Sequence, residues 1–132
     1  MNADSIIHLA IPCHDVEQAR FFYVDILNMS QGRIYDDRVS VNFFGAQLVC
    51  HLVSEVEPAQ NAYPRHFGLT YTDEKKFDAF YEYLKGQSSV RFFSDLSIRF
   101  EGKPEAHKTF FILDPSENVL EFKYYFDQSQ NY

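Results

Sequence analysis

The chain has 132 residues, of which 45% are hydrophobic, and this length and composition fit one domain, residues 1–132. Its formal net charge is −7, and its 12 Lys and Arg residues are scattered along the sequence. This charge argues against a nucleic-acid partner, because phosphate binding needs a clustered basic surface, so we expect a small-molecule ligand.

The N-terminus and the cysteines indicate in which cellular compartment the protein is found. Met1–Ser5 has no basic region, and no apolar run approaches the roughly 20 residues that span a bilayer. Cys13 and Cys50 belong to no Cys-x-x-Cys pair, and no secretory signal precedes them, so we expect two reduced, buried thiols. The sequence therefore predicts a cytoplasmic protein with no membrane partner.

The first half of the chain predicts a strand, a helix and three further strands. An alternating run, Ile6–Ile11, ends at Pro12, and Asp15 is a suitable N-cap for a helix from Val16 to Leu27. Three extended stretches separated by turn residues follow: Gly32–Tyr35, Val39–Phe44 and Gln47–Val53. This βαβββ order defines a first module over about residues 5–54.

After a polar connection the same order returns. A strand around His66 leads to Thr72–Asp73, which cap a helix that runs through Lys85 and ends at Gly86. Three extended stretches follow, the first irregular near Ser94–Asp95: Val90–Phe93 with an extension to Phe100, Thr109–Leu113 and Val119–Tyr125. We therefore expect a second βαβββ module over about residues 64–126 and a C-terminal tail, 127–132.

Two histidines occupy matching places in the two modules. His8 and His66 are 58 residues apart, and each lies in a short strand-like run that a helix follows. Because successive side chains of a strand point to opposite faces, each histidine lies opposite the large apolar side chains. The neighbours on its own face, Ala10 and Gly68, are small. This pattern predicts that both imidazoles line a pocket.

Glu121 lies on the corresponding face of the last strand, opposite the large apolar side chains. Alternation puts Leu120 and Phe122 on the apolar face and Glu121 on the other, where a partly buried carboxylate needs a partner or a metal. A single histidine in a strand is more often a structural residue, but two related histidines and a carboxylate together suit iron(II), manganese or zinc with open coordination positions. The predicted metal ligands are therefore His8, His66 and Glu121.

Two further residues are catalytic candidates. His51 shares a strand face with Val49, and it would be either a fourth ligand or an acid/base close to the substrate. Arg99 would hold an anionic group of the substrate, although an arginine of this kind is more often solvated or ion-paired.

Three segments carry a resemblance to a known family, and the last of them is the most specific: His8–Asn28, His66–Leu69 and Phe110–Lys123. The third is similar to the Asp-Pro-x-Gly-Asn-x-(Leu/Ile)-Glu ending of the vicinal oxygen chelate superfamily, which comprises glyoxalase I, the bleomycin-resistance proteins and the extradiol dioxygenases. With Ile98–Pro104 before it, the chain looks closest to a small single-domain, extradiol-dioxygenase-like group.

The resemblance implies an α+β fold in which two βαβββ modules form a curled, barrel-like mixed sheet around a metal or ligand cavity, with the helices outside. It puts His8, His66 and Glu121 at the ligand positions of a divalent metal, with iron(II) or manganese favoured and zinc or nickel as alternatives. Vicinal oxygens of the substrate would chelate that metal. Related proteins pair modules between chains, so the resemblance also allows a homodimer.

The chain departs from the family pattern at two positions. Glu117 replaces the usual glycine of the last turn, and His51 falls near the strand position where glyoxalase I carries a carboxylate ligand. The leading hypothesis is an extradiol-dioxygenase-like metalloenzyme for a catechol-like substrate. The alternatives are a glyoxalase-type lyase or isomerase, and a metal-free binding protein like the bleomycin-resistance members.

Overall fold

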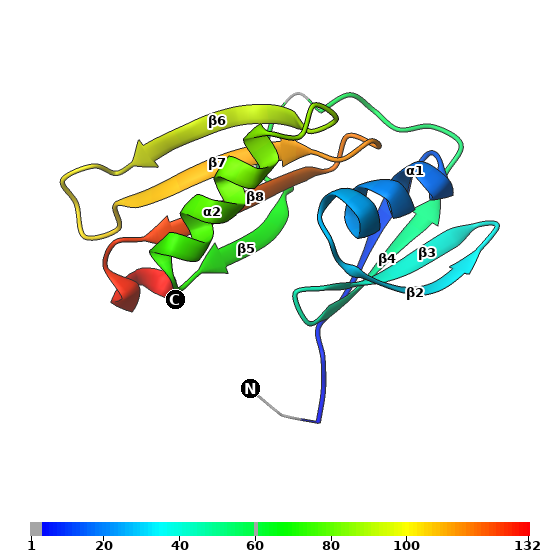
Figure 1. Cartoon of the computed structure of the whole chain (residues 1–132), viewed down its shortest axis with the longest axis horizontal. Helices are drawn as coiled ribbons and strands as arrows, with labels where there is room; N and C mark the ends of the chain where they lie inside the picture. The colour runs from blue at the N-terminus through cyan, green and yellow to red at the C-terminus, as the bar shows by residue number, and fades with distance from the viewer. Residues whose placement is uncertain (1–3, 60) are drawn as a thin grey trace. The chain divides into compact units, whose positions relative to one another are not determined.

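A computed structural model describes residues 4–59 and 61–132 and divides them between two compact units. One unit holds the chain up to Pro58 together with Asp114–Asn118, and the other holds Ala59–Leu113 and Val119–Tyr132. Each unit contains a four-stranded mixed sheet and one main helix (Figure 1). The α+β class and the repeated βαβββ order are therefore confirmed. The expected barrel-like sheet is not observed, because the strand order in each unit is linear and leaves two edges.

The first unit follows the predicted order. Its elements are β1 (His8–Cys13), α1 (Val16–Arg20), η1 (Phe21–Ile26), β2 (Ser30–Tyr35), β3 (Arg38–Phe43) and β4 (Ala46–Leu52). The strand order is β1-β4-β3-β2, with β1 parallel to β4 and the other pairs antiparallel. The sequence predicted that the first strand ends at Pro12, but β1 continues to Cys13. Because β1 is an edge strand, the ladder tolerates the missing N–H of a proline.

The first helix begins as predicted and then changes its winding. The Asp15 side chain accepts a hydrogen bond from the backbone N–H of Gln18 at 2.8 Å. After Arg20 the chain continues as the π-helix η1 and not as the expected α-helix. The Leu27 N–H donates to the Phe22 carbonyl five residues back, and both Phe22 and Tyr23 are buried.

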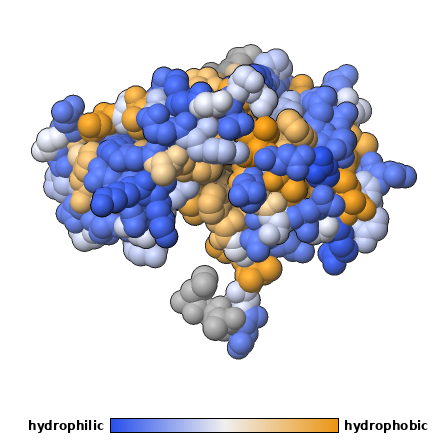
Figure 2. All heavy atoms as spheres, viewed as in Figure 1, coloured by the Kyte–Doolittle hydropathy of each residue, from blue (hydrophilic) through white to orange (hydrophobic). Residues whose placement is uncertain are grey.

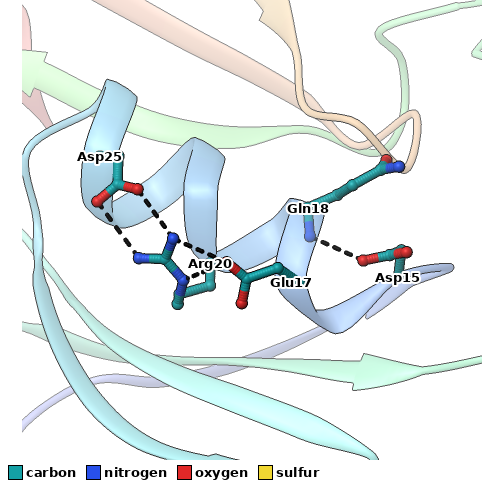
Figure 3. A network of polar contacts seen from close by, with 5 residues as sticks. All are labelled: Asp15, Glu17, Gln18, Arg20 and Asp25. Atoms are coloured by element: carbon teal, nitrogen blue, oxygen red, sulfur yellow. Dashed lines mark hydrogen bonds and ion pairs between the residues drawn. The ribbon is translucent and has the colours of Figure 1, made fainter.

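Charged side chains of this helical segment form a network of ion pairs (Figure 3). Arg20 bonds Glu17 through Nε at 2.8 Å and Asp25 through Nη2 at 2.9 Å. These carboxylates raise the pKa of Arg20, and the exposed network adds little to the stability of the unit.

The turn Asp114–Asn118 packs within the first unit, although it joins two strands of the second. Asp114 is buried and accepts hydrogen bonds from the Tyr23 hydroxyl (2.7 Å), the Ser116 N–H (2.8 Å) and the Asn118 N–H (2.9 Å). The Asn118 amide donates to Asp114 and to the Pro12 carbonyl. Burial raises the pKa of Asp114 above its usual range. This carboxylate is therefore the polar centre of the turn.

Glu117 of this turn adopts a left-handed backbone conformation with φ of 68°. A Cβ in this region costs about 1 kcal/mol, and glycine does not carry that cost. We expect Glu117→Gly to raise the free energy of unfolding by up to about 1 kcal/mol in urea denaturation. Glu117→Ala is the control, because it removes the charge but keeps the Cβ. An equal gain from both variants would contradict the backbone explanation.

The second unit repeats the order of the first. Its elements are β5 (Phe67–Tyr71), α2 (Glu74–Lys85), β6 (Arg91–Arg99), β7 (His107–Leu113), β8 (Val119–Tyr125) and the short 3-10 helix η2 (Gln128–Asn131). The strand order is β5-β8-β7-β6, with β5 parallel to β8. The irregularity expected near Ser94–Asp95 is confirmed, because the register of β6 shifts on both sides of Ser94.

Aromatic side chains form much of the core of this unit. Phe110 and Phe122 stack with their ring centroids 5.5 Å apart, and Phe77 and Phe80 of α2 pack against them. Hydrophilic side chains cover the outward side of α2 (Figure 2), as expected for an amphipathic helix. The aromatic residues of the chain are divided between core and surface: Phe77, Phe110 and Phe122 are buried, whereas Phe44, Phe100 and Phe126 are exposed.

The thiols of Cys13 and Cys50 are free and buried, as predicted. Burial raises the pKa of both, so they are protonated near neutral pH. Within the described parts of the chain, no helix is long and apolar enough to cross a membrane.

Candidate functional site

His66 and Glu121 meet on one face of the second sheet. Nε2 of His66 lies 3.1 Å from Oε1 of Glu121, whose side chain is only 7% exposed. His66 directly precedes β5, one residue outside the strand in which the sequence predicted it. Gly68 is the register partner of Glu121, and a Cβ on Gly68 would lie 1.6 Å from the Glu121 carbonyl oxygen. Glycine is therefore required for β5 and β8 to pair at this point.

The hydrogen bonds of the pair define which atoms face each other. Nδ1 of His66 lies 2.8 Å from the Ala62 carbonyl oxygen, which only accepts, so Nδ1 carries the hydrogen. A neutral His66 therefore presents a bare Nε2 to a carboxylate oxygen. Two acceptors at 3.1 Å require a proton or a metal cation between them, so this donor set fits a divalent ion.

Other groups hold the carboxylate in place. The Thr109 hydroxyl donates to Oε2 of Glu121 at 2.6 Å, and Nζ of Lys123 lies 3.9 Å from Oε1. A metal ligand that is itself hydrogen-bonded keeps its orientation as an ion binds or leaves. Sequence reasoning missed Thr109, because a threonine in a strand carries no signal of what it contacts.

Arg99 lines a cavity of about 360 Å³ in the same unit. Its guanidinium donates to the Tyr63 hydroxyl and lies over the rings of Tyr63 and Phe100. The Tyr63 ring also packs edge-on against His66, with the ring centroids 5.2 Å apart. Thr109, which bonds Glu121, lines the same cavity. The structure therefore brings Arg99 into the surroundings of the His66–Glu121 pair.

His8 and His51 line a separate pocket of about 410 Å³ in the first unit. Nδ1 of His8 lies 2.8 Å from Oε1 of Gln47, its register partner on β4, so this ring is also held through Nδ1. His51 is four residues further along β4, about 13 Å at the usual rise of a strand. This spacing separates His51 from His8 and disfavours its role as a fourth ligand.

Within residues 4–59 and 61–132, no three or more His, Cys, Asp or Glu side chains gather in a group that could hold a metal. Of the predicted site residues, the structure joins His66 with Glu121 and brings Arg99 near them. His8 and His51 lie in the other unit, where both line its pocket.

A family model described as the Glyoxalase/Bleomycin resistance protein/Dioxygenase superfamily matches residues 5–122. The chain belongs to this superfamily. A crystal structure of a glyoxalase/bleomycin resistance protein/dioxygenase from Alicyclobacillus acidocaldarius is 50% identical, with a TM-score of 0.92 over 99% of this chain and 98% of that one. A search of curated proteins found no match.

More distant solved structures share the fold. The fosfomycin resistance protein FosX from Listeria monocytogenes is 14% identical, with a TM-score of 0.70 over 98% of this chain and 99% of that one. Lactoylglutathione lyase from Agrobacterium tumefaciens is 18% identical, with a TM-score of 0.68 over 93% and 95%. The family match confirms the superfamily that the sequence motifs indicated, and these two structures add the fold alone.

Proposed function

We propose that the protein is an extradiol-dioxygenase-like metalloenzyme for a catechol-like substrate with vicinal oxygens. His66 and Glu121 would hold iron(II) or manganese(II), with His8 as the third ligand that the sequence and the family resemblance predict. The observation that carries this proposal is the His66–Glu121 pair, in which Nε2 of His66 lies 3.1 Å from a carboxylate oxygen of Glu121. A bound ion would supply open positions for two oxygens of a diol and for dioxygen.

The ring environment of His8 supports its place as the third ligand. In both His8 and His66 an oxygen atom engages Nδ1: the amide oxygen of Gln47 and the carbonyl oxygen of Ala62, each at 2.8 Å. This contact leaves Nε2 available in both rings. Metal-binding histidines are commonly oriented in this way through their other nitrogen.

The pocket face of β4 favours three protein ligands over four. Gln47, Val49 and His51 line the pocket from this strand, and none of them is a carboxylate. A glyoxalase-type isomerase with a further carboxylate ligand from this strand is therefore less well supported. His51, at the far end of the pocket from His8, would exchange protons with the part of the substrate remote from the metal, and Arg99 with Tyr63 would orient the substrate.

Oxygen consumption tests this function. Protein reconstituted with iron(II) or manganese(II) is expected to consume one O₂ per molecule of a catechol panel member and to open the ring, with both oxygen atoms retained in the product. Labelling with ¹⁸O₂ and mass spectrometry follow both atoms. Isomerisation of a hemithioacetal without oxygen uptake would assign the glyoxalase-type reaction and overturn the proposal.

A further inference from the structure

The pocket of the first unit is cationic although the protein is acidic. Among the described residues, Arg33 and Arg38 are the charged ones that line it and no Asp or Glu does, whereas the whole chain has a net charge of −7. Tyr35 and the buried Val49 add aromatic and aliphatic surface. This combination fits a flat apolar ligand that carries an anionic group.

The register of the sheet orders these side chains along the pocket. His8 pairs with Gln47 at one end, Val49 pairs with Ser40 in the middle, and His51 pairs with Arg38 at the other end. Each step of two residues is about 7 Å along the strands. A ligand that begins at His8 and extends by the size of one substituted ring therefore reaches the middle of this ladder.

A β-bulge in β2 sets the position of Arg33. The register with β3 shifts between Gln31 and Ile34, and the Arg33 N–H donates to the Ser40 hydroxyl at 2.9 Å. A Cβ on Gly32 would lie 2.5 Å from that hydroxyl, so a glycine permits the close approach of the strands. A bulge of this kind changes the direction of a side chain, and here both Arg33 and Tyr35 line the pocket.

The two pocket arginines differ from Arg20 in their partners. Arg20 is ion-paired with two carboxylates (Figure 3). In the described part of the chain, no carboxylate pairs with the Arg33 guanidinium. Among the described carboxylates, Arg38 pairs with Asp37 alone, at 3.8 Å, and its guanidinium lies over the Tyr35 ring at 5.0 Å. Both guanidinium groups therefore remain available to a carboxylate in the ligand, which arginine binds with two parallel hydrogen bonds.

We propose that this pocket binds an aromatic carboxylate, with its ring against Val49 and Tyr35 and its carboxylate on Arg33, assisted by Arg38. The inference deepens the proposed function and rests on it for the other end of the ligand, where vicinal hydroxyls would face the metal. The substrate class is then a catechol that carries a carboxylate.

Calorimetric titration with 3,4-dihydroxybenzoate and catechol tests the proposal on metal-loaded protein without oxygen. The wild type is expected to bind 3,4-dihydroxybenzoate at least about tenfold more tightly than catechol. Arg33→Gln is expected to remove this preference and leave catechol binding unchanged. Arg20→Gln is the matched control, because it removes the same charge from the same unit but lies on the helix, and it is expected to keep the preference.

Titration of Glu121→Gln with benzoate separates this proposal from the proposed function. Benzoate has no diol, so it should not need the metal. If Glu121→Gln binds benzoate and the double variant Glu121→Gln/Arg33→Gln does not, the carboxylate pocket is supported even if the protein consumes no oxygen. Equal binding of 3,4-dihydroxybenzoate and catechol, unchanged by Arg33→Gln, would overturn the pocket assignment. That result would overturn it even if catechol were cleaved.

Discussion

Glu121→Gln is expected to bind iron(II) or manganese(II) at least about 100-fold more weakly than the wild type, with the fold retained. The substitution keeps the size of the side chain but replaces a charged oxygen with an amide at the atom that faces Nε2 of His66. Thr109→Val removes only the 2.6 Å hydrogen bond to Oε2 and should weaken binding by a smaller factor, about 10–100-fold. Titration of each purified apoprotein with the metal measures both effects.

Glu101→Gln is the control for this pair of variants. Glu101 is exposed in the loop after β6, so the substitution makes the same chemical change on a solvated side chain. Its metal affinity should equal that of the wild type, and circular dichroism should show that all three variants are folded. Wild-type metal affinity in Glu121→Gln would remove Glu121 from the ligand set.

Asp114→Ala is expected to lower the free energy of unfolding by about 3–5 kcal/mol, the largest loss of stability among the substitutions considered. The buried Tyr23 hydroxyl and the N–H groups of Ser116 and Asn118 all donate to this carboxylate. Without it these donors lose their acceptor, and the buried Tyr23 hydroxyl has no access to water to replace it. Urea denaturation followed by circular dichroism measures the change.

Two other variants distinguish the stability lost with this hydrogen-bond network from a general effect of substitution on stability. Tyr23→Phe removes a single donor and should cost about 1 kcal/mol. Asp36→Ala, in the exposed turn between β2 and β3, should change stability by less than about 0.5 kcal/mol. A loss below about 1 kcal/mol in Asp114→Ala would show that the turn is not held by its carboxylate.

The sequence predicted elements well where local signals and burial agree. Helix α2 begins after Asp73 and ends before Gly86 as expected, because a side-chain cap, an apolar stripe and a glycine all indicate the same bounds. The π-helix η1 was not predicted. The apolar residues of this segment have the spacing of an α-helix, and that periodicity does not reveal a local change to hydrogen bonds five residues back.

In the candidate site too, local sequence signals predicted some features and missed others. Strand alternation correctly put Glu121 on the face of His66, because parity in a strand is a local property. The groups that orient these side chains, Thr109 and the Ala62 carbonyl, were not predicted, because their contacts depend on packing between segments. The arginines of β2 and β3 were missed as well, because a bulge determines where Arg33 lies.

Metal content tests the central claim most directly. Wild-type protein from iron-supplemented cells, purified without oxygen or chelating resin, would be analysed by inductively coupled plasma mass spectrometry. We predict close to one iron or manganese ion per chain, either as purified or after reconstitution. Stoichiometric zinc or nickel would contradict the dioxygenase assignment in favour of an isomerase, and no binding of any of these ions would contradict a metalloenzyme altogether.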